Sequence, residues 1–357
     1  MAAKFLPIPD LCIRPYGAHC QRCRNACPAH AISFENESST PTIDHDACTH
    51  CGICMGICDG FSSTRVTLAD LHERLQRIAM RGQIVYITCK ENILPDFEPA
   101  ENVCVVPCMA LIPPELWALI LAENIPVCIA CDLHYCEDCT VAPKLGELLF
   151  SRAIEMAESW TGGNVRWDHQ IPEKRTVEHI ITDETGYSRR DTFDNLKNDV
   201  LDVASGKRRL RNSDVLQDFY QRRERSRAVQ RLNIDGNAID KITPQGRTRT
   251  IMMPRHNMIL QAAKQKPESA AHMPLVIAHI DHHTCIHCLD CVPHCITGAL
   301  RASSTTGALE MDPRLCIGCE ACIPQCKKAA ISLTETTAMD VLITGSIFDE
   351  DHAKTSK

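Results

Sequence analysis

The pattern of apolar and polar residues between 83 and 160 predicts strands separated by helices. Three apolar runs, GQIVYITC, NVCVVPC and IPVCIAC, end at Cys89, Cys108 and Cys131. Between the second and third runs, PPELWALILAEN has proline in its first turn and an apolar stripe, which is typical of a helix. KLGELLFSRAIEMAESW predicts a longer amphipathic helix after the third run. Strands that alternate with helices indicate a small parallel α/β sheet.

Both ends of the chain have only short alternating stretches, which predict small strands. AISFE at 31–35 and TIDHD at 42–46 have counterparts in ALRAS at 299–303 and ALEMD at 308–312. The sequence therefore predicts a multidomain chain of α+β and α/β parts. Its expected divisions are a small domain at 1–80, an α/β domain at 81–165, a basic helical and irregular linker at 166–273, a second small domain at 274–340 and a tail at 341–357.

Composition narrows the class of protein. Only 4% of the 357 residues are aromatic, while 23 are cysteine, so metal must replace part of the missing apolar core at the two ends. The cysteine count is odd and the first residues, MAAKFLPIPD, lack the apolar region of a secretory signal. No apolar stretch is long enough to span a membrane. We therefore expect a reducing cytoplasm rather than disulfides. The net charge of −7 disfavours a general nucleic-acid binder.

Eight cysteines near the C-terminal end repeat a spacing that binds 4Fe–4S clusters. The pattern C-x2-C-x2-C-x3-C occurs twice, 31 residues apart. In such runs three thiolates from one loop hold one cluster, and the fourth cysteine ligates the other cluster. We therefore expect two crossed ligand sets, which are set A, Cys285, Cys288, Cys291 and Cys326, and set B, Cys316, Cys319, Cys322 and Cys295. Zinc knuckles have no use for the third and fourth cysteines of each run.

The N-terminal end has the same pattern with one departure. The gap after Cys12 holds seven residues where two are usual, and the cluster stays feasible if Cys12 can fold back. The expected sets are set C, Cys12, Cys20, Cys23 and Cys58, and set D, Cys48, Cys51, Cys54 and Cys27.

These motifs resemble bacterial two-cluster ferredoxins over residues 8–62 and 278–335. The first also resembles the variant with a seven-residue gap found in ferredoxin-like electron-transfer subunits. Cys58, Cys295 and Cys326 lack the proline that usually follows the run. The resemblance implies two ferredoxin-like dicluster domains with four 4Fe–4S clusters, flanking the α/β domain. Fully thiolate-ligated clusters suit an electron relay and leave no iron open to substrate.

The cysteines of the α/β domain form a separate candidate site. Cys89, Cys108 and Cys131 each end a predicted strand, at the edge where open α/β sheets bind ligands. With Cys136, this region resembles the small iron–sulfur (delta) subunit of methyl-viologen-reducing hydrogenases, which links a hydrogenase to heterodisulfide reductase. The resemblance implies a flavodoxin-like sheet and a 2Fe–2S cluster held by the middle set, Cys89, Cys108, Cys131 and Cys136. Such a cluster would be a stepping stone between the terminal domains, or an exit to a flavoprotein partner.

Other interpretations of this region stay open. CIACDLHYCEDC would also allow a local zinc or 4Fe–4S site built from Cys128, Cys131, Cys136 and Cys139, which makes Cys139 an alternative ligand. A metal-free region with a redox dithiol at Cys136 and Cys139 is the third possibility. Cys104 and Cys128 lie inside apolar strands and are interpreted as core residues.

Two further features accompany these motifs. Residues 203–231 carry an excess of Arg and Lys, interpreted as a solvated helical linker or as a docking face for an acidic redox partner. Histidines next to the cysteines, such as His50 and His294, are interpreted as polar loop residues.

The sequence favours an electron-transfer subunit over a stand-alone catalyst. We expect a relay in a cytoplasmic anaerobic oxidoreductase complex, similar to hydrogenase and heterodisulfide reductase assemblies, with other redox subunits and a flavoprotein as partners. Two alternatives remain, which are an iron–sulfur reductase acting through the middle-domain cysteines and a redox-sensing regulatory protein.

Overall fold

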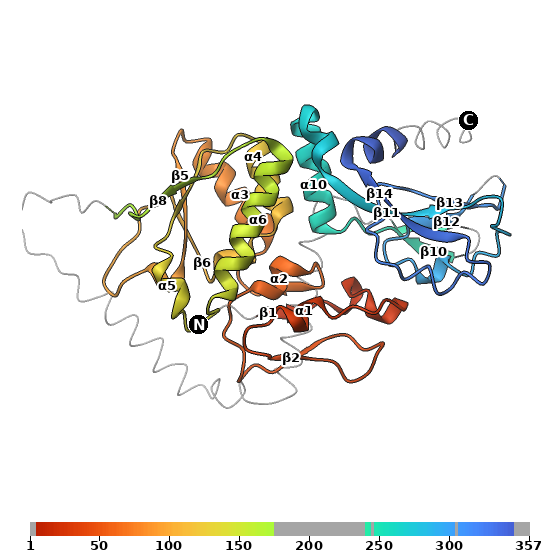
Figure 1. Cartoon of the computed structure of the whole chain (residues 1–357), viewed down its shortest axis with the longest axis horizontal. Helices are drawn as coiled ribbons and strands as arrows, with labels where there is room; N and C mark the ends of the chain where they lie inside the picture. The colour runs from red at the N-terminus through yellow and green to blue at the C-terminus, as the bar shows by residue number, and fades with distance from the viewer. Residues whose placement is uncertain (1–4, 175–239, 244–245, 304–305, 346–357) are drawn as a thin grey trace, which may run out of the picture.

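The computed structural model describes residues 5–174, 240–243, 246–303 and 306–345 (Figure 1). The predicted basic segment at 203–231 lies outside the described residues. A parallel sheet and the C-terminal strands lie on either side of the short helices α1 (Arg22–Asn25) and α2 (Ile53–Ile57) (Figure 1). Within the described parts of the chain, no helix has the length and apolar character needed to cross a membrane.

The two ends of the chain are built alike. At the N-terminal end, β1 (Phe5–Pro7) pairs antiparallel with β4 (Phe61–Ser63), and β2 (Ile32–Ser33) pairs with β3 (Thr42–Ile43). At the C-terminal end, β11 (Pro274–Ile280) pairs with β14 (Ile331–Thr337), and β12 (Leu300–Ala302) pairs with β13 (Leu309–Met311). The short strands predicted from the alternating stretches are therefore confirmed. Each end encloses its cysteine loops between two small antiparallel ladders.

The middle of the chain forms a four-stranded parallel sheet, as predicted. Its strands are β5 (Val85–Cys89), β6 (Val103–Val106), β7 (Val127–Ala130) and β8 (Arg166–Asp168), in the spatial order β6-β5-β7-β8. The fourth strand, β8, extends the sheet beyond the predicted boundary at 165. The sheet therefore gathers the carboxyl ends of β5, β6 and β7 at one edge.

Four helices accompany the sheet. The capping box of Thr67 and Asp70 begins α3 (Leu68–Ala79), and Pro114 begins α4 (Pro114–Ala122). The loop after β7 contains the short α5 (His134–Glu137), and α6 (Leu145–Thr161) leads to β8. Both helices predicted from the sequence are confirmed. α4 packs against α6 and is buried around its whole circumference (Figure 1).

The linker predicted for 166–273 contains a packed helix in its C-terminal part. Residues 254–265 form α10 (Pro254–Gln265), which packs against α4, and the 3-10 helix η5 (Pro267–His272) follows it. Buried side chains such as Ile259 and Leu260 join the main core. Burial against α4 explains the helix, because most helical stability in proteins comes from packing.

The cores of the parts differ in size. One large apolar cluster includes Ile87, Trp117 and Phe150 and continues into α10 and part of the N-terminal domain. The C-terminal domain has a separate core of seven buried residues, two of which are Cys291 and Cys322. The small core therefore depends on its own cysteines for much of its packing.

Candidate iron–sulfur centres

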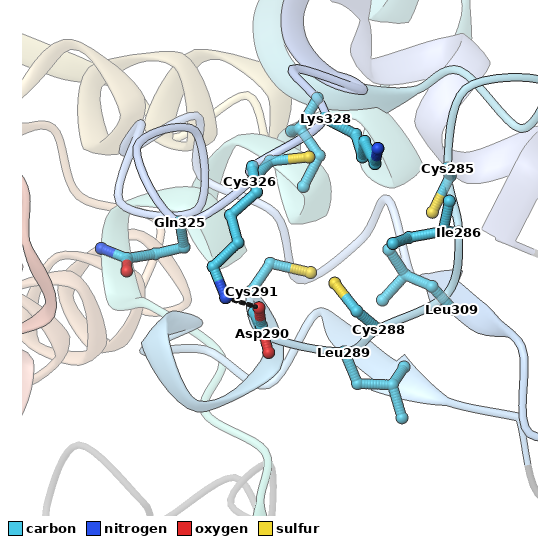
Figure 2. Close-up of a pocket in the computed structure, with 12 residues that line it drawn as sticks. Cys285, Ile286, Cys288, Leu289, Asp290, Cys291, Leu309, Gln325, Cys326 and Lys328 are labelled. Atoms are coloured by element: carbon cyan, nitrogen blue, oxygen red, sulfur yellow. Dashed lines mark hydrogen bonds and ion pairs between the residues drawn. The ribbon is translucent and has the colours of Figure 1, made fainter.

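The four cysteines of set A line one cavity at the surface of the C-terminal domain. Figure 2 shows the sulfur atoms of Cys285, Cys288, Cys291 and Cys326 turned toward a common cavity of about 170 Å³. Cys288 is exposed, whereas the other cysteines of the chain are buried or half-buried. Beside the cavity, Lys327 Nζ lies 3.0 Å from Asp290 Oδ2. Set A is therefore the candidate centre with a solvent-accessible thiol.

Sets B and D are assembled in the same crossed manner. Each lines a cavity of its own, formed by Cys295, Cys316, Cys319 and Cys322 for set B and by Cys27, Cys48, Cys51 and Cys54 for set D. In both sets three cysteines come from one run and the fourth comes from the other run of the same domain.

Set C requires the seven-residue insertion, residues 13–19, to turn back on itself. The 3-10 helices η1 (Pro9–Leu11) and η2 (Arg14–Tyr16) lie on either side of Cys12 and Ile13, and Gly17 follows with a left-handed φ of 99°. Cys12 and Cys20 then lie close enough to Cys23 for their ionised sulfurs to repel it. Cys58 in turn lies close to Cys20 and Cys23. The insertion thus folds back, and Cys12 lies near the other cysteines of set C.

A buried arginine holds this insertion in place. The guanidinium of Arg14 donates hydrogen bonds to the carbonyl oxygens of Ser39 (3.0 Å), Asn36 (2.9 Å) and Cys20 (2.6 Å). It also lies 3.9 Å from the centre of the Phe34 ring. The role of Arg14 could not be predicted from the sequence, because no local pattern around a single loop arginine indicates which carbonyls it will bind.

The fourth cysteine of every run accepts the same kind of hydrogen bond at its sulfur. Its sulfur accepts a hydrogen bond from a backbone N–H a few residues further along the chain. The four bonds are Ala31 to Cys27 (3.3 Å), Gly60 to Cys58 (3.3 Å), Leu300 to Cys295 (3.4 Å) and Ala330 to Cys326 (3.2 Å). Hydrogen bonds to ligand sulfur help to set the reduction potential of iron–sulfur clusters.

The four terminal sets fit metal clusters chemically. Burial raises the pKa of Cys23 and Cys291 to about 11, and that of Cys58 and Cys322 to about 12. Thiols with such pKa values stay protonated at neutral pH unless a metal replaces the proton, and metal coordination deprotonates a thiol outright. Four thiols that face one another, with at least one of them buried in each set, are therefore a donor set for cationic iron.

The middle set is assembled from separate strand ends. Cys89 is the last residue of β5, Cys108 follows β6 by two residues, and Cys131 directly follows β7. The chain passes from β5 to β6 on one side and then crosses to β7 on the other, so the strand order reverses at β5. Open α/β sheets bind ligands at the carboxyl edge beside such a reversal.

The loop after β7 completes this candidate site. A small cavity at the sheet edge is lined by Cys89, Cys108, Cys136 and Cys139, with Gly146 and Phe150 of α6. Cys131 shares hydrogen bonds with Cys89 and Cys136. The structure therefore brings Cys89, Cys108, Cys131 and Cys136 together, with Cys139 beside them. A Cβ atom at Gly146 would lie only 3.0 Å from Cys108 Sγ, so glycine leaves room for this sulfur.

The middle thiols differ from one another in acidity. The hydrogen bond from Cys131 lowers the pKa of Cys89 to about 6, although burial acts in the opposite direction. Hydrogen bonds from the backbone N–H groups of Asn92 and Glu91 also lower this pKa. Burial raises the pKa of Cys108 to about 12. The buried Asn92 side chain also donates from Nδ2 to the sulfurs of Cys131 (2.8 Å) and Cys89 (3.2 Å). The site thus favours thiolate at Cys89 even without metal.

The alternative local site is not assembled. Cys128 lies within β7, where the charged groups that affect its thiol are Asp168 and Arg166, and it does not line the cavity of the other cysteines. Cys104 is 1% exposed and belongs to the main core, as predicted. Among the described residues, no three His, Cys, Asp or Glu side chains are arranged to hold a single metal ion. A zinc knuckle needs its sulfurs about 2.3 Å from one ion, whereas cluster ligands surround a larger core.

The middle set lies beside set D. The thiols of Cys108 and Cys51 are close enough to affect each other, and Thr49 Oγ1 donates a 2.8 Å hydrogen bond to the carbonyl of Val141. A Cβ atom at Gly56 of α2 would overlap the carbonyl oxygen of Ala110, two residues after Cys108. The cysteine contacts therefore join the middle set to the N-terminal domain. A position of the middle centre between the two terminal domains was one expectation from the sequence, and these contacts with the N-terminal domain differ from it.

One comparison with known proteins identifies part of the chain. Residues 17–59 match the family model of the 4Fe-4S dicluster domain. The match contains seven of the eight cysteines of sets C and D, and Cys12 lies outside it. No curated protein and no solved structure matches the chain significantly. The N-terminal part is therefore a 4Fe–4S dicluster domain, which supports an iron–sulfur electron-transfer protein.

Proposed function

We propose that this chain is an electron relay with four 4Fe–4S clusters, held by sets A to D, and one 2Fe–2S cluster, held by the middle set. The observation that carries the proposal is the crossed arrangement of the terminal sets, in which Cys58 lies with Cys20 and Cys23 rather than with its own run. Bound clusters of this kind supply reversible one-electron redox chemistry.

The side chains of the sets have a simple role in this function. The thiolates hold the irons, and the backbone N–H groups that point at Cys27, Cys58, Cys295 and Cys326 stabilise their negative charge. Because each set has a full complement of four cysteines, the clusters have no need of a substrate as ligand. Complete ligation of this kind favours electron transfer over catalysis at iron.

The wider role is a relay subunit in a cytoplasmic anaerobic oxidoreductase complex. The strand order β6-β5-β7-β8 agrees with the flavodoxin-like arrangement expected for the delta subunit of methyl-viologen-reducing hydrogenase. That likeness supports other redox subunits, including a flavoprotein, as partners.

A second candidate function rests on Cys139. This fifth thiol lines the cavity of the middle set although a 2Fe–2S cluster needs four ligands. A surplus thiol beside a redox centre is suited to the reduction of a disulfide substrate.

The test is a reductive titration of the anaerobically reconstituted chain with dithionite. We expect uptake of about five electrons per chain, one for each cluster, and full reoxidation by an added one-electron acceptor. Uptake of two electrons or fewer would contradict the relay. Multiple turnovers of a small disulfide by the isolated reduced chain would instead support the reductase.

A further inference from the structure

Seven residues separate Cys12 from Cys20, whereas two residues separate the first two cysteines of each other run. The insertion is therefore longer than ligation requires. We infer that residues 13–19 form the connector that holds the C-terminal domain against the N-terminal domain and places set B beside set C. This inference rests on the proposed function for the identity of the centres, and it adds how they are joined.

The connector is rigid on its own side. Arg14 is 6% exposed, and its guanidinium donates three hydrogen bonds to backbone carbonyls of the N-terminal domain. Its stacking on Phe34 fixes the plane of the guanidinium. The backbone on both sides of Arg14 therefore presents a fixed surface.

The other side of the connector contacts the C-terminal domain. His294 Nδ1 donates a 3.3 Å hydrogen bond to the carbonyl oxygen of Tyr16. Ile13 and Tyr16 pack in one apolar cluster with Ile296 and Ile317, around a core that also contains Ile8 and Leu11. At Gly17 a Cβ atom would lie 3.2 Å from Gln325 Nε2, so the two domains approach closely here. Polar and apolar contacts thus come from one loop.

The contact residues are chain neighbours of the ligands. Ile13 follows Cys12 of set C, while His294 and Ile296 flank Cys295 of set B. Cys319 of set B itself packs against the shared apolar cluster. A contact made by these residues necessarily brings the two ligand sets near each other. Because electron tunnelling slows steeply with distance, this contact decides whether the terminal domains exchange electrons.

Cys51 of set D also lies close to Cys108 of the middle set. This proximity and the connector together give the centres a serial order. The order is set A, set B, set C, set D and the middle set. The N-terminal domain then lies in the interior of the series, and the exposed Cys288 marks one end. Electrons pass one at a time, so that each transfer oxidises one centre and reduces its neighbour without a bond being made or broken.

The test combines two substitutions in the full-length, reconstituted protein. Ile13→Glu places a charge in the shared apolar cluster, and Cys319→Ser removes the centre of set B. The measurement is the microwave-power saturation of the EPR signal of set C in the dithionite-reduced protein. That signal is identified as the one lost in Cys23→Ser. A paramagnetic neighbour speeds spin relaxation, so the effect of removing set B reports its proximity.

In the wild-type background, Cys319→Ser should slow the relaxation of the set C signal several-fold. In the Ile13→Glu background the same substitution should have little further effect, as in a double-mutant cycle. An equal effect in both backgrounds, or none in the wild type, overturns the connector. Ile84→Glu, at a position that is 38% exposed on the sheet domain, is the matched control.

Iron content separates this result from the proposed function. Ile13→Glu should keep all five centres by metal analysis and spectroscopy. If this variant loses set C, His294→Ala removes the hydrogen bond to Tyr16 from the opposite domain and should still weaken the coupling. A chain without four cubanes contradicts the proposed function itself, whereas a fully loaded chain with unchanged coupling contradicts only the connector.

Discussion

The terminal domains and the parallel-sheet domain place cysteines around a centre in different ways. A terminal set takes three ligands from one short loop and one from its partner loop, and the hydrogen-bond donors at the fourth cysteine are nearby backbone N–H groups. The middle set takes three of its cysteines from strand ends and the fourth, Cys136, from α5. A buried side chain, Asn92, donates to two of the sulfurs. Local spacing thus defines the first kind of site, and sheet topology defines the second.

The two kinds of site also differ in what supports them without metal. The sheet belongs to the large apolar core, in which Ile87, Trp117 and Ile129 are completely buried. The separate C-terminal core has only seven buried residues and includes two ligands of the proposed clusters. This difference indicates that metal binding and folding are coupled more strongly in the C-terminal domain than in the sheet domain.

Removal of iron should therefore have unequal effects, and this is the largest expected difference. After anaerobic chelation, backbone amides of β12 and β13 should exchange hydrogen at nearly unfolded rates, because the cysteines of their core lose the metal that they ligate. Amides of β5 and β7 should stay protected by the apolar core. Hydrogen exchange with mass spectrometry measures both regions in one sample. Retained protection of β12 would contradict the comparison.

Crossed ligation can be tested within the N-terminal domain. Cys58→Ala should remove the cluster of set C, with a loss of about four iron atoms, although Cys58 belongs to the run that supplies set D. Cys27→Ala is the reciprocal control and should remove the cluster of set D. Iron analysis and EPR distinguish the two losses. Loss of set D in Cys58→Ala would show that ligands follow the sequence runs instead.

The middle centre should depend on the strand ends. Cys108→Ser should remove about two iron atoms and leave the four cubanes intact. Cys104→Ser is the matched control, because Cys104 is buried within β6, the strand that precedes Cys108, and lies outside the site. A silent Cys108→Ser, together with loss of a centre in Cys128→Ser, would favour a local site and contradict assembly by the sheet.

The smallest expected effect concerns Asn92. Its two hydrogen bonds stabilise the more negative, reduced form of the middle centre, so Asn92→Ala should lower the reduction potential. In a one-electron couple, about 60 mV corresponds to roughly 1.4 kcal/mol, a typical energy for a hydrogen bond to a charged group. EPR-monitored redox titration measures the shift. Asn102→Ala removes a side-chain amide that donates to the carbonyl oxygen of Ile84, and it should leave the potential unchanged.

Local patterns predicted the contiguous features of this molecule well. Cysteine spacing suggested crossed sets whose members lie together in the structure, and apolar runs identified β5, β6 and β7. The prediction missed β8, whose three residues are all exposed and which forms a strand because it pairs with β7. It also missed α10, whose burial comes from α4 in a distant part of the chain.

The side chains that support the sites were equally hidden in the sequence. The partners of Arg14 lie 6 to 25 positions away along the chain, and Cys131 lies 39 positions from Asn92, so only the folded chain brings them near. The contact of Arg255 on α10 with Glu115 on α4, at 2.7 Å, is of the same kind. Such residues have no periodicity or spacing of their own, because tertiary structure alone selects them.

The most direct test of the account is a count of iron and acid-labile sulfide in the anaerobically reconstituted chain. Four cubanes and one 2Fe–2S cluster predict about 18 atoms of each per chain, and about 16 in Cys108→Ser. Iron near 8 atoms per chain, with zinc making up the rest, would contradict the four-cubane account.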